Sequence, residues 1–255
     1  MAEQVCGKCG GSGWLVVEQD GISGAERCDC VQEDRARRLE ENTGIPPLYQ
    51  SASLENFENF GNPAMSEVQN IVRAYTREYP FLPKPGLLLL GPPGSGKTHL
   101  AAAALRRLVA RGFAGLFYDY QNLLDRIRSG YDASSGSSDR EAYRAALDAE
   151  VLLLDDLGAH RVTDWVEDTV TSIVTHRCNN KKALIATTNL PDADAGDRLV
   201  ERSSSLPGKV EYRVSLVERI GVRARSRLFE MCRVVHMPAV GDYRLRKQGP
   251  RSPTA

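Results

Sequence analysis

The sequence lacks a net charge, a membrane-spanning apolar run and a secretion signal, and each absence excludes a class of function. Lysine plus arginine equals aspartate plus glutamate at 33 each, so the total charge alone predicts no nucleic-acid partner. No apolar run approaches the ~20 residues that a membrane helix needs. The start, MAEQVCGKCGG, has no charged-then-apolar signal pattern. We therefore expect a soluble, cytoplasmic protein with no membrane partner.

The charges that are present are unevenly distributed along the chain. Residues 201–255 hold 12 basic and 5 acidic side chains, a net of +7, whereas residues 1–200 hold 21 basic and 28 acidic side chains, a net of −7. A basic segment of this kind is either a solvated surface or a contact for phosphates, which belong to nucleic acid or to a nucleotide held by a neighbour. Charge alone leaves both interpretations open.

The cysteines are few but concentrated near the N-terminus. Four of the six lie in the first thirty residues: Cys6, Cys9, Cys28 and Cys30. In a reducing compartment such residues are metal ligands or buried thiols rather than disulfides. Two short turns, C-x-x-C and C-x-C, can supply the four thiolates of a structural zinc site, with an iron–sulfur site or a Cys6/Cys9 redox pair as the alternatives. The other two, Cys178 and Cys232, have no nearby partner and are expected to be buried thiols.

Short apolar runs alternate with helical patterns from residue 86 onward. The runs GLLLL, AGLFYDY, EVLLLDDLG, KALIATTN and CRVVHM read as strands, and continuous apolar strands between helices predict a parallel sheet covered on both faces. Before this region we expect a charged helix over 31–42, an irregular stretch over 48–62 and a helix over 63–80. Residues 191–215 are polar and read as a loop or an insertion, followed by a helix over 216–231.

The string GPPGSGKT at 91–98 fits the pattern G-x-x-x-x-G-K-[ST] and lies between a strand and a helix. Its glycines allow backbone N–H groups to surround an anion, and the helix N-terminus adds its dipole. Lys97 can reach the β- and γ-phosphates, and Thr98 can ligate Mg²⁺. A glycine-rich turn with a chance lysine is the alternative, which the spacing and both flanks disfavour. The predicted nucleotide contacts are Gly91, Pro92, Pro93, Gly94, Ser95, Gly96, Lys97, Thr98 and His99.

Two later strands end in polar residues that complete a nucleotide site. EVLLLDDLG places two carboxylates after a buried strand, so Asp155 can bind Mg²⁺ with Thr98 while Asp156 orients or activates a water. Two acidic residues in an ordinary turn would be the alternative if they stood alone. The strand ALIATTNL ends in Asn189, which can hydrogen-bond the γ-phosphate or the attacking water.

The segments GPPGSGKTHLAAAAL, LLLDDLG, TTNL and ERIGVRARSRL, in this order, resemble AAA+ ATPases and, more narrowly, the DnaC/IstB group. The resemblance covers residues 45–247 and implies an α/β P-loop fold with ATP as the nucleotide. It implies that Asn189 is the first sensor, that Arg227 is an arginine finger acting on a neighbour's ATP, and that Arg244 is the second sensor near the phosphates. Without the resemblance, RARSRL reads as a solvated basic face. The role of Arg223 stays open.

The same resemblance implies a function and its alternatives. The group includes bacterial replicative-helicase loaders, so we expect an ATPase that loads a replicative DNA helicase onto single-stranded DNA and assembles into an ATP-dependent oligomer. The alternatives are an ATPase helper of a transposase on duplex DNA and a nucleotide-gated adaptor with little hydrolysis. The cysteine module favours the first function, because the resemblance implies an all-helical N-terminal part without cysteines for the transposition branch.

The resemblance also implies a division into domains. The sequence departs from the group at two places, the segment 191–215 and Asp156. We expect a zinc module with a charged linker helix over 1–44, the ATPase domain over 45–247 and a disordered tail over 248–255. Residues 191–215 are longer than the link that the group implies. Asp156 stands where many AAA+ enzymes carry glutamate, so hydrolysis is expected to be slow and stimulated by assembly or DNA.

Overall fold

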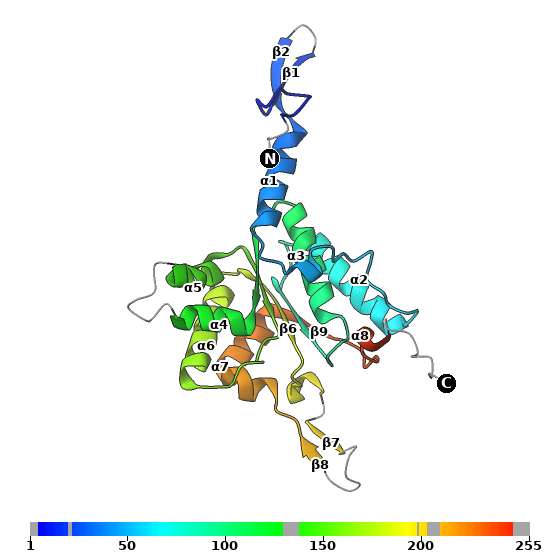
Figure 1. The fold of residues 1–255 in the computed structure, drawn as a ribbon, viewed down its shortest axis with the longest axis vertical. Coiled ribbons are helices and arrows are strands. Elements are labelled where there is room, and N and C mark those ends of the chain that lie inside the picture. The colour runs from blue at the N-terminus through cyan, green and yellow to red at the C-terminus, as the bar shows by residue number, and fades with distance from the viewer. Residues whose placement is uncertain (1–4, 20–21, 130–137, 198, 203–209, 247–255) are drawn as a thin grey trace, which may run out of the picture.

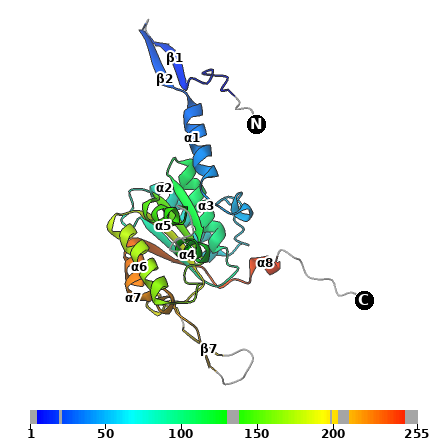
Figure 2. The ribbon, with the colours of Figure 1, turned by 60° about the vertical axis from the view of Figure 1, so that its left-hand side comes forward.

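The computed structural model describes residues 5–19, 22–129, 138–197, 199–202 and 210–246. A rounded α/β body contains most of these residues, and an N-terminal hairpin and helix extend from it (Figures 1 and 2). The predicted disordered tail, 248–255, lies outside the described residues. None of the helices in the described ranges is long and apolar enough to cross a membrane.

A five-stranded parallel sheet forms the centre of the body. Its order is β4-β5-β6-β3-β9, and its strands are β3 (Gly86–Leu90), β4 (Gly115–Asp119), β5 (Val151–Asp155), β6 (Ala183–Thr188) and β9 (Cys232–His236). Every residue of β3 and β6 is buried. Helices cover both faces, which is why these strands are apolar without alternation. The predicted parallel sheet is confirmed.

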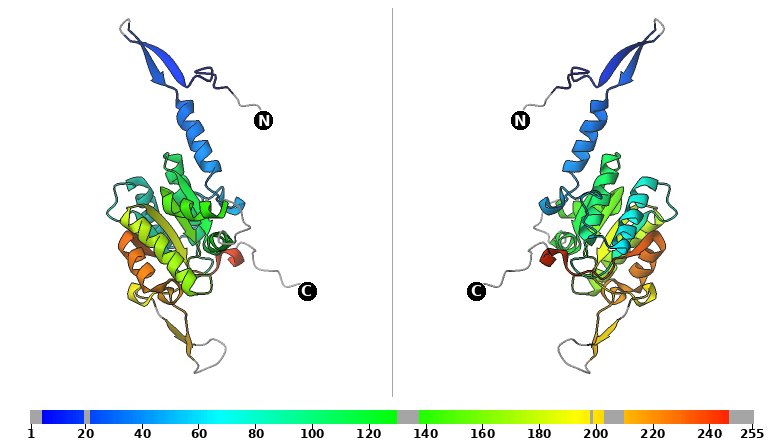
Figure 3. Two further views of the ribbon diagram at one scale, coloured as in Figure 1. Left: turned by 90° about the vertical axis from the view of Figure 1, so that its left-hand side faces the viewer. Right: turned by 90° about the vertical axis from the view of Figure 1, so that its right-hand side faces the viewer.

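Helices pack on the two faces of the sheet (Figure 3). Their buried side chains form two apolar clusters with those of the strands. One face carries α2 (Pro63–Glu78) and α3 (Lys97–Ala110), and the other carries α4 (Tyr120–Ser129), α5 (Ser138–Asp148), α6 (Asp164–Asn179) and α7 (Leu216–Met231). Successive residues of a strand point to opposite faces. Leu89 therefore joins the first cluster, and Leu88 and Leu90 join the second.

Helix α7 begins where the sequence predicts but is interrupted inside. Ser215 and Glu218 form a reciprocal capping box at its start. Gly221 has φ 79° and ψ 157°, so the predicted continuous helix over 216–231 is broken at this residue. The left-handed backbone angle favours glycine at this position, and a Cβ at Gly221 would also require the carboxylate of Glu167 on α6 to move.

The segment predicted as a polar loop or an insertion over 191–215 contains regular structure, so the expectation of an irregular loop is wrong. It forms a short 3₁₀ turn, η2 (Ala193–Ala195), and an antiparallel pair, β7 (Val200–Arg202) and β8 (Val210–Tyr212), that projects from the body (Figure 1). Strands of three residues are too short to show a period in the sequence. Asp192 caps the turn, and its Oδ2 accepts a 2.9 Å hydrogen bond from Arg225 Nε on α7.

The N-terminal part is a hairpin that stands on a helix. Strands β1 (Trp14–Gln19) and β2 (Ile22–Arg27) pair antiparallel, and α1 (Asp29–Glu41) connects them to the body. The second cysteine pair is not a separate turn as predicted, because Cys28 is the N-cap of α1 and Cys30 lies in its first turn. At the other end of α1, Glu40 accepts a 2.8 Å hydrogen bond from Arg106 on α3. A short turn, η1 (Pro47–Tyr49), follows.

Candidate active site

The predicted phosphate loop joins β3 to α3 at the carboxyl edge of the sheet, where ligands bind in open parallel sheets. Gly94 and Gly96 have φ of 72° and 90°, in the left-handed region. A Cβ at Gly94 would collide with the carboxylate of Asp242, and one at Gly96 would collide with the ring of Phe57. Both positions therefore need glycine. The loop and the start of α3 together provide the backbone N–H groups of an anion site.

The ammonium group of Lys97 is buried inside this loop. Its Nζ donates to the carbonyl oxygens of Gly91 at 2.9 Å and Pro92 at 2.8 Å, and to Asn189 Oδ1 at 2.7 Å. Burial lowers the pKa of Lys97 to about 8, although the nearby carboxylates of Asp156 and Asp155 act in the opposite direction. The lysine is thus held at the centre of the loop, where its charge can pair with phosphate oxygens.

Asp155, at the end of β5, accepts hydrogen bonds from two hydroxyl groups. Thr187 Oγ1 donates to Asp155 Oδ1 at 2.7 Å, and the Thr98 hydroxyl also bonds this carboxylate. Burial raises the pKa of Asp155, and these two hydrogen bonds oppose that rise. A carboxylate beside a hydroxyl is an oxygen donor set that fits Mg²⁺. A magnesium ion held by Thr98 and Asp155 would neutralise charge that develops on the phosphates.

Asp156 has a backbone conformation that is unusual for a residue with a side chain. Its φ is 56°, and its carboxylate accepts a 2.6 Å hydrogen bond from Asn189 Nδ2. Asn189 Oδ1 also accepts a hydrogen bond from Lys97, so the chain of contacts Lys97–Asn189–Asp156 links the start of α3 to the ends of β6 and β5. The structure therefore brings together the lysine, both carboxylates and the predicted first sensor. This arrangement can hold phosphates and orient a water beside them.

The other residues predicted for the loop take supporting positions. The Ser95 hydroxyl donates to the Pro92 carbonyl at 2.8 Å, so it stabilises the loop itself. His99 lies in the first turn of α3, where its ring is 5.6 Å from the ring of Phe57 and its Nε2 is 3.1 Å from the carbonyl oxygen of Ser53. Pro93 lies within the loop and adds no N–H donor.

A cavity of 170 Å³ adjoins the phosphate loop on the side of α2. It shares Gly94, Ser95 and Gly96 with the loop and is otherwise lined by residues of the stretch 56–65, by His99 and by residues 240–243. Phe60 and Tyr243, which come from opposite ends of the body's sequence, are in ring contact at 5.8 Å beside it. A cavity that combines aromatic rings with amide side chains can accept a flat aromatic group.

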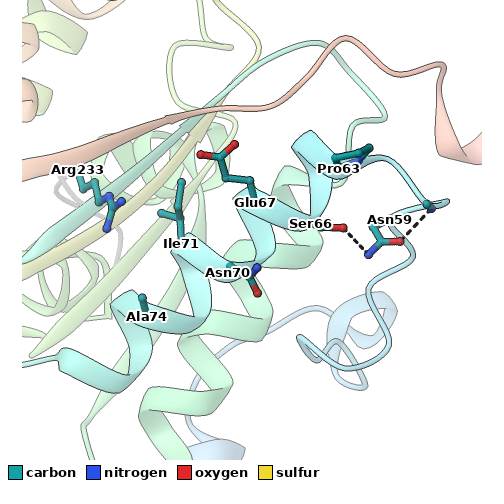
Figure 4. A pocket seen from close by; sticks show the side chains of 9 residues that line it. Asn59, Pro63, Ser66, Glu67, Asn70, Ile71, Ala74 and Arg233 are labelled. Atoms are coloured by element: carbon teal, nitrogen blue, oxygen red, sulfur yellow. Dashed lines mark hydrogen bonds between the residues drawn. The ribbon is translucent and has the colours of Figure 1, made fainter.

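A second hollow, of 730 Å³, is shallower and lies apart from the phosphate loop (Figure 4). One stripe of α2 lines it together with Arg233 of β9, and Asn59 closes one end by bonding the hydroxyl of Ser66 at 3.0 Å. Its volume is larger because the hollow is wide and open to solvent. None of the predicted nucleotide contacts lines it, so the smaller cavity is the relevant one for this site.

The two predicted arginines have different positions relative to the loop. Arg244 lies on α8 (Tyr243–Arg246), and its charge contributes to the lowered pKa of Lys97. The Tyr243 N–H donates to the Gly94 carbonyl at 3.1 Å, which holds the start of α8 against the loop. Arg227 is exposed, pairs with Glu230 at 2.6 Å and lies near Cys178 at the end of α6. The structure therefore brings Arg244 to the site of its own chain but not Arg227.

Thr187, which had no predicted role, lies in the site, and Arg219 packs just outside it. Thr187 contacts both carboxylate residues, and its signal was the polar pair TT at the end of β6. Arg219 on α7 packs against Gly158, just after the carboxylates, and donates to the His160 carbonyl at 3.4 Å. Its position inside ERIG gave no indication of this contact, because the two segments are about sixty residues apart in the sequence.

The four N-terminal cysteines meet at a second site, at the base of the β1–β2 hairpin. Their sulfur atoms all lie within 4.8 Å of one another, with Cys6 and Cys28 at 3.8 Å and Cys9 and Cys30 at 3.5 Å. Four sulfurs around zinc at about 2.3 Å are about 3.8 Å apart, so this cluster could hold zinc. The Gly13 N–H donates to Cys9 Sγ at 3.3 Å, and this bond lowers the pKa of the Cys9 thiol, whereas the hydrogen bond between Cys9 and Cys30 raises the pKa of the Cys30 thiol.

The remaining two cysteines lie apart from this cluster. Cys232 is buried at the start of β9, as predicted, and burial raises the pKa of its thiol. Cys178 is only half-buried, which differs from the prediction, because it lies at the exposed end of α6.

Comparison with known proteins places this geometry in a family. Residues 30–202 match the family described as IstB-like ATP binding protein. The chain is 25% identical over 237 residues to the phage-like element PBSX protein XkdC of Bacillus subtilis (89% of this chain, 79% of that protein). It is 24% identical over 178 residues to the replicative helicase loader DnaC of Escherichia coli K12 (67% and 71%).

Solved structures agree with the sequence comparison. A crystal structure of the DnaC helicase loader superposes with a TM-score of 0.60 at 30% identity, covering 76% of this chain and all of that one. A structure of DnaI, at 21% identity and a TM-score of 0.58, shares the fold. With the phosphate loop, the two carboxylates and the sensor asparagine in one place, these matches show that the chain belongs to the IstB/DnaC-type family of AAA+ ATP-binding proteins and is an ATPase.

Proposed function

We propose that this ATPase loads a replicative DNA helicase onto single-stranded DNA. The observation that carries the proposal is the pairing of an ATPase body similar to a solved helicase loader with a separate four-cysteine module that stands away from it on α1 (Figure 2). The body provides a nucleotide-controlled switch, and the module provides a second surface for a partner. The proposal places the chain in the cytoplasm, where it meets the helicase.

In this proposal ATP lies along the carboxyl edge of the sheet. Gly91 to Thr98 bind the phosphates, and the 170 Å³ cavity takes the base between the stretch 56–65 and α8. Thr98 and Asp155 hold Mg²⁺, Asp156 orients the water, and Asn189 contacts the γ-phosphate or that water. The hydrogen bonds among Lys97, Asn189 and Asp156 support these roles, because they already bring the groups within reach of one site.

The zinc module, residues 1–44, contacts the helicase in this proposal. Its hairpin exposes three large apolar side chains, with Trp14 51%, Val16 81% and Val17 39% exposed. Exposed apolar side chains on a small hairpin are a common feature of protein-binding surfaces. We keep the division into a module at 1–44 and an ATPase domain at 45–247 as part of this proposal, and the position of α1 between the cysteine cluster and α3 supports it.

The basic C-terminal segment contributes to assembly and DNA binding in this proposal. Arg227 is exposed on α7 and lies away from its own phosphate loop, as an arginine that acts on a neighbour's ATP must. The chain would then form an ATP-dependent oligomer in which hydrolysis depends on assembly. The net charge of +7 over residues 201–255 favours contact with the phosphates of single-stranded DNA.

The test is a loading assay with purified full-length chain, the replicative helicase of the same host and single-stranded DNA coated with single-strand binding protein. With ATP, we expect the chain to bind the helicase and to start unwinding from an internal site. Lys97→Ala is the control and should fail to start unwinding. A chain that does not bind this helicase under any nucleotide condition would refute the proposal.

The second candidate is an ATPase helper of a transposase on duplex DNA, which the IstB-like family description favours. It predicts tight, ATP-dependent binding to duplex DNA and capture of a transposase encoded beside the gene. The same preparations test it, because duplex and single-stranded DNA can be compared directly at a fixed salt concentration.

A further inference from the structure

One hydroxyl group contacts both acidic residues of the site. Thr187 Oγ1 donates to Asp155 Oδ1 at 2.7 Å and accepts from the Asp156 backbone N–H at 2.9 Å. The Thr187 carbonyl also accepts from the Leu157 N–H at 2.7 Å. The side chain is 1% exposed, so water has no access to compete for these bonds.

A hydroxyl is required at this point because it both donates and accepts. The carboxylate of Asp155 needs a donor, and the Asp156 N–H needs an acceptor. An apolar side chain of the same size would leave a backbone N–H unpaired and remove one of the two hydroxyl bonds to the carboxylate. The next residue, Thr188, has a different task, since its hydroxyl bonds only the backbone at Leu157 and Leu190.

The hydrogen bond from the Asp156 N–H to the Thr187 hydroxyl matters because of the backbone conformation of Asp156. With φ at 56° this residue adopts a left-handed conformation, which aspartate tolerates better than most residues other than glycine but which still has a conformational cost. Hydrogen bonds from neighbouring groups offset that cost. The Thr187 hydroxyl holds the N–H of Asp156 while Asn189 holds its carboxylate.

We propose that Thr187 is a positioning residue that fixes Asp155 for Mg²⁺ and Asp156 for the attacking water. This inference rests on the metal and water roles proposed above for these two residues. Groups that orient a metal ligand through hydrogen bonds typically change metal affinity or activity about 10- to 100-fold when they are removed. Thr187 touches neither the metal nor the substrate and acts through the two aspartates.

The experiment compares Thr187→Val, which keeps the shape and removes the hydroxyl, with Thr187→Ser, which keeps the hydroxyl. ATP affinity of the full-length chain is measured with a fluorescent ATP analogue, once with Mg²⁺ and once with EDTA. The gain from Mg²⁺ is the ratio of the ATP affinity with Mg²⁺ to the ATP affinity in EDTA. We expect Thr187→Val to leave the ATP affinity in EDTA within about twofold of the wild type and to reduce the gain from Mg²⁺ by about 10- to 100-fold. Serine should restore the gain to near the wild-type value.

A matched control and a second pair of variants separate positioning from folding. Thr76→Val removes another buried hydroxyl, which donates to the Arg73 carbonyl within α2, and should leave the gain from Mg²⁺ unchanged. If Thr187→Val does not fold, Thr187→Ala and Thr187→Ser provide the same comparison, since they differ by the hydroxyl oxygen alone. The unchanged affinity in EDTA verifies that each variant is folded.

A valine variant with an unchanged gain from Mg²⁺ and unchanged turnover would overturn the proposal. Equal losses with and without Mg²⁺ would also overturn it, because they would mean a general defect of the pocket. These outcomes are independent of helicase loading. A chain that loads no helicase can still show the Mg²⁺ effect, and a loader can still lack it.

Discussion

The ATPase body and the cysteine module differ in what holds them together. In the body, two apolar clusters line the sheet, and residues such as Leu89 and Leu153 are fully buried. In the module, Cys28 is the only buried side chain in the ranges 5–18 and 23–30, for which burial is described. Apolar burial contributes about 25 cal/mol per Å², and a hairpin of this size buries too little apolar area to form a stable core of its own. We therefore expect the module to depend on a metal held by its four cysteines, whereas the body has its own apolar core.

The largest expected effect is loss of the metal site. Cys28→Ser/Cys30→Ser should remove zinc binding, whose apparent free energy is about 10–16 kcal/mol, and unfold the module. Metal analysis should give about one zinc per chain in the wild type and none in the variant, while ATP binding by the body is kept. Cys178→Ser, outside the cluster, is the control and should keep its zinc. Full zinc occupancy in the double variant would refute the four-cysteine site.

A second prediction concerns Arg227 and the assembly of neighbouring subunits. Arg227→Ala should bind ATP almost normally and lose about 10³–10⁵ in turnover, because the missing charge acts on a neighbour's ATP. Mixing the Arg227→Ala variant with the Lys97→Ala variant should recover part of the ATPase activity. Recovery is expected at subunit interfaces where the intact pocket of the first variant meets the intact Arg227 of the second.

Glu230→Ala is the matched control for this variant. It breaks the same Arg227–Glu230 ion pair but keeps the arginine, so its turnover should be nearly normal. If mixed oligomers form and activity stays at the sum of the separate variants, Arg227 has no role in trans. Zinc content should be the same in all of these chains.

A third prediction separates binding from hydrolysis inside the body. Asp156→Asn should keep ATP binding and lose about 10²–10⁴ in turnover, since the amide cannot accept a proton from water. Asparagine tolerates the left-handed backbone of this position, so the variant should fold normally. Steady-state phosphate release and equilibrium ATP binding measure the two effects. Normal phosphate release would assign water activation to another residue.

The smallest of these effects in free energy is expected at Lys97. Lys97→Ala removes the buried cation of the phosphate loop and should weaken ATP binding by about 2–5 kcal/mol, the usual loss for one partner of a buried charge pair. Lys84→Ala is the control, because Lys84 bonds the Phe229 carbonyl and is not among the phosphate-loop residues. Calorimetric titration measures both. Near-normal ATP affinity in Lys97→Ala would contradict the phosphate-loop interpretation.

The sequence predicted the parts of the fold and site that depend on local patterns. The phosphate loop has fixed spacing, and the carboxylates and Asn189 each end an apolar strand, so their meeting at one edge of a parallel sheet could be expected. The four cysteines were identifiable by spacing for a similar reason. The strand and helix order from residue 86 onward also followed from apolar runs.

What the sequence did not predict depends on contacts between distant segments. The cavity beside the loop is lined by residues from distant parts of the chain, among them Phe60 and Tyr243, whose rings are in contact. Gly221 lies against Glu167 of another helix, and the pairing of β7 with β8 involves strands of three residues. Thr187 was visible as a polar residue, but its two bonds follow from the side-by-side position of β5 and β6.

The most direct test of the account is helicase capture by the Cys28→Ser/Cys30→Ser variant, with ATP binding measured in the same sample. In the proposed division of roles, the module binds the helicase and the body binds the nucleotide. The variant is therefore expected to lose the helicase and to bind ATP with unchanged affinity. A variant that has no zinc and still captures the helicase, or one that loses ATP binding together with zinc, would contradict the division between the two regions.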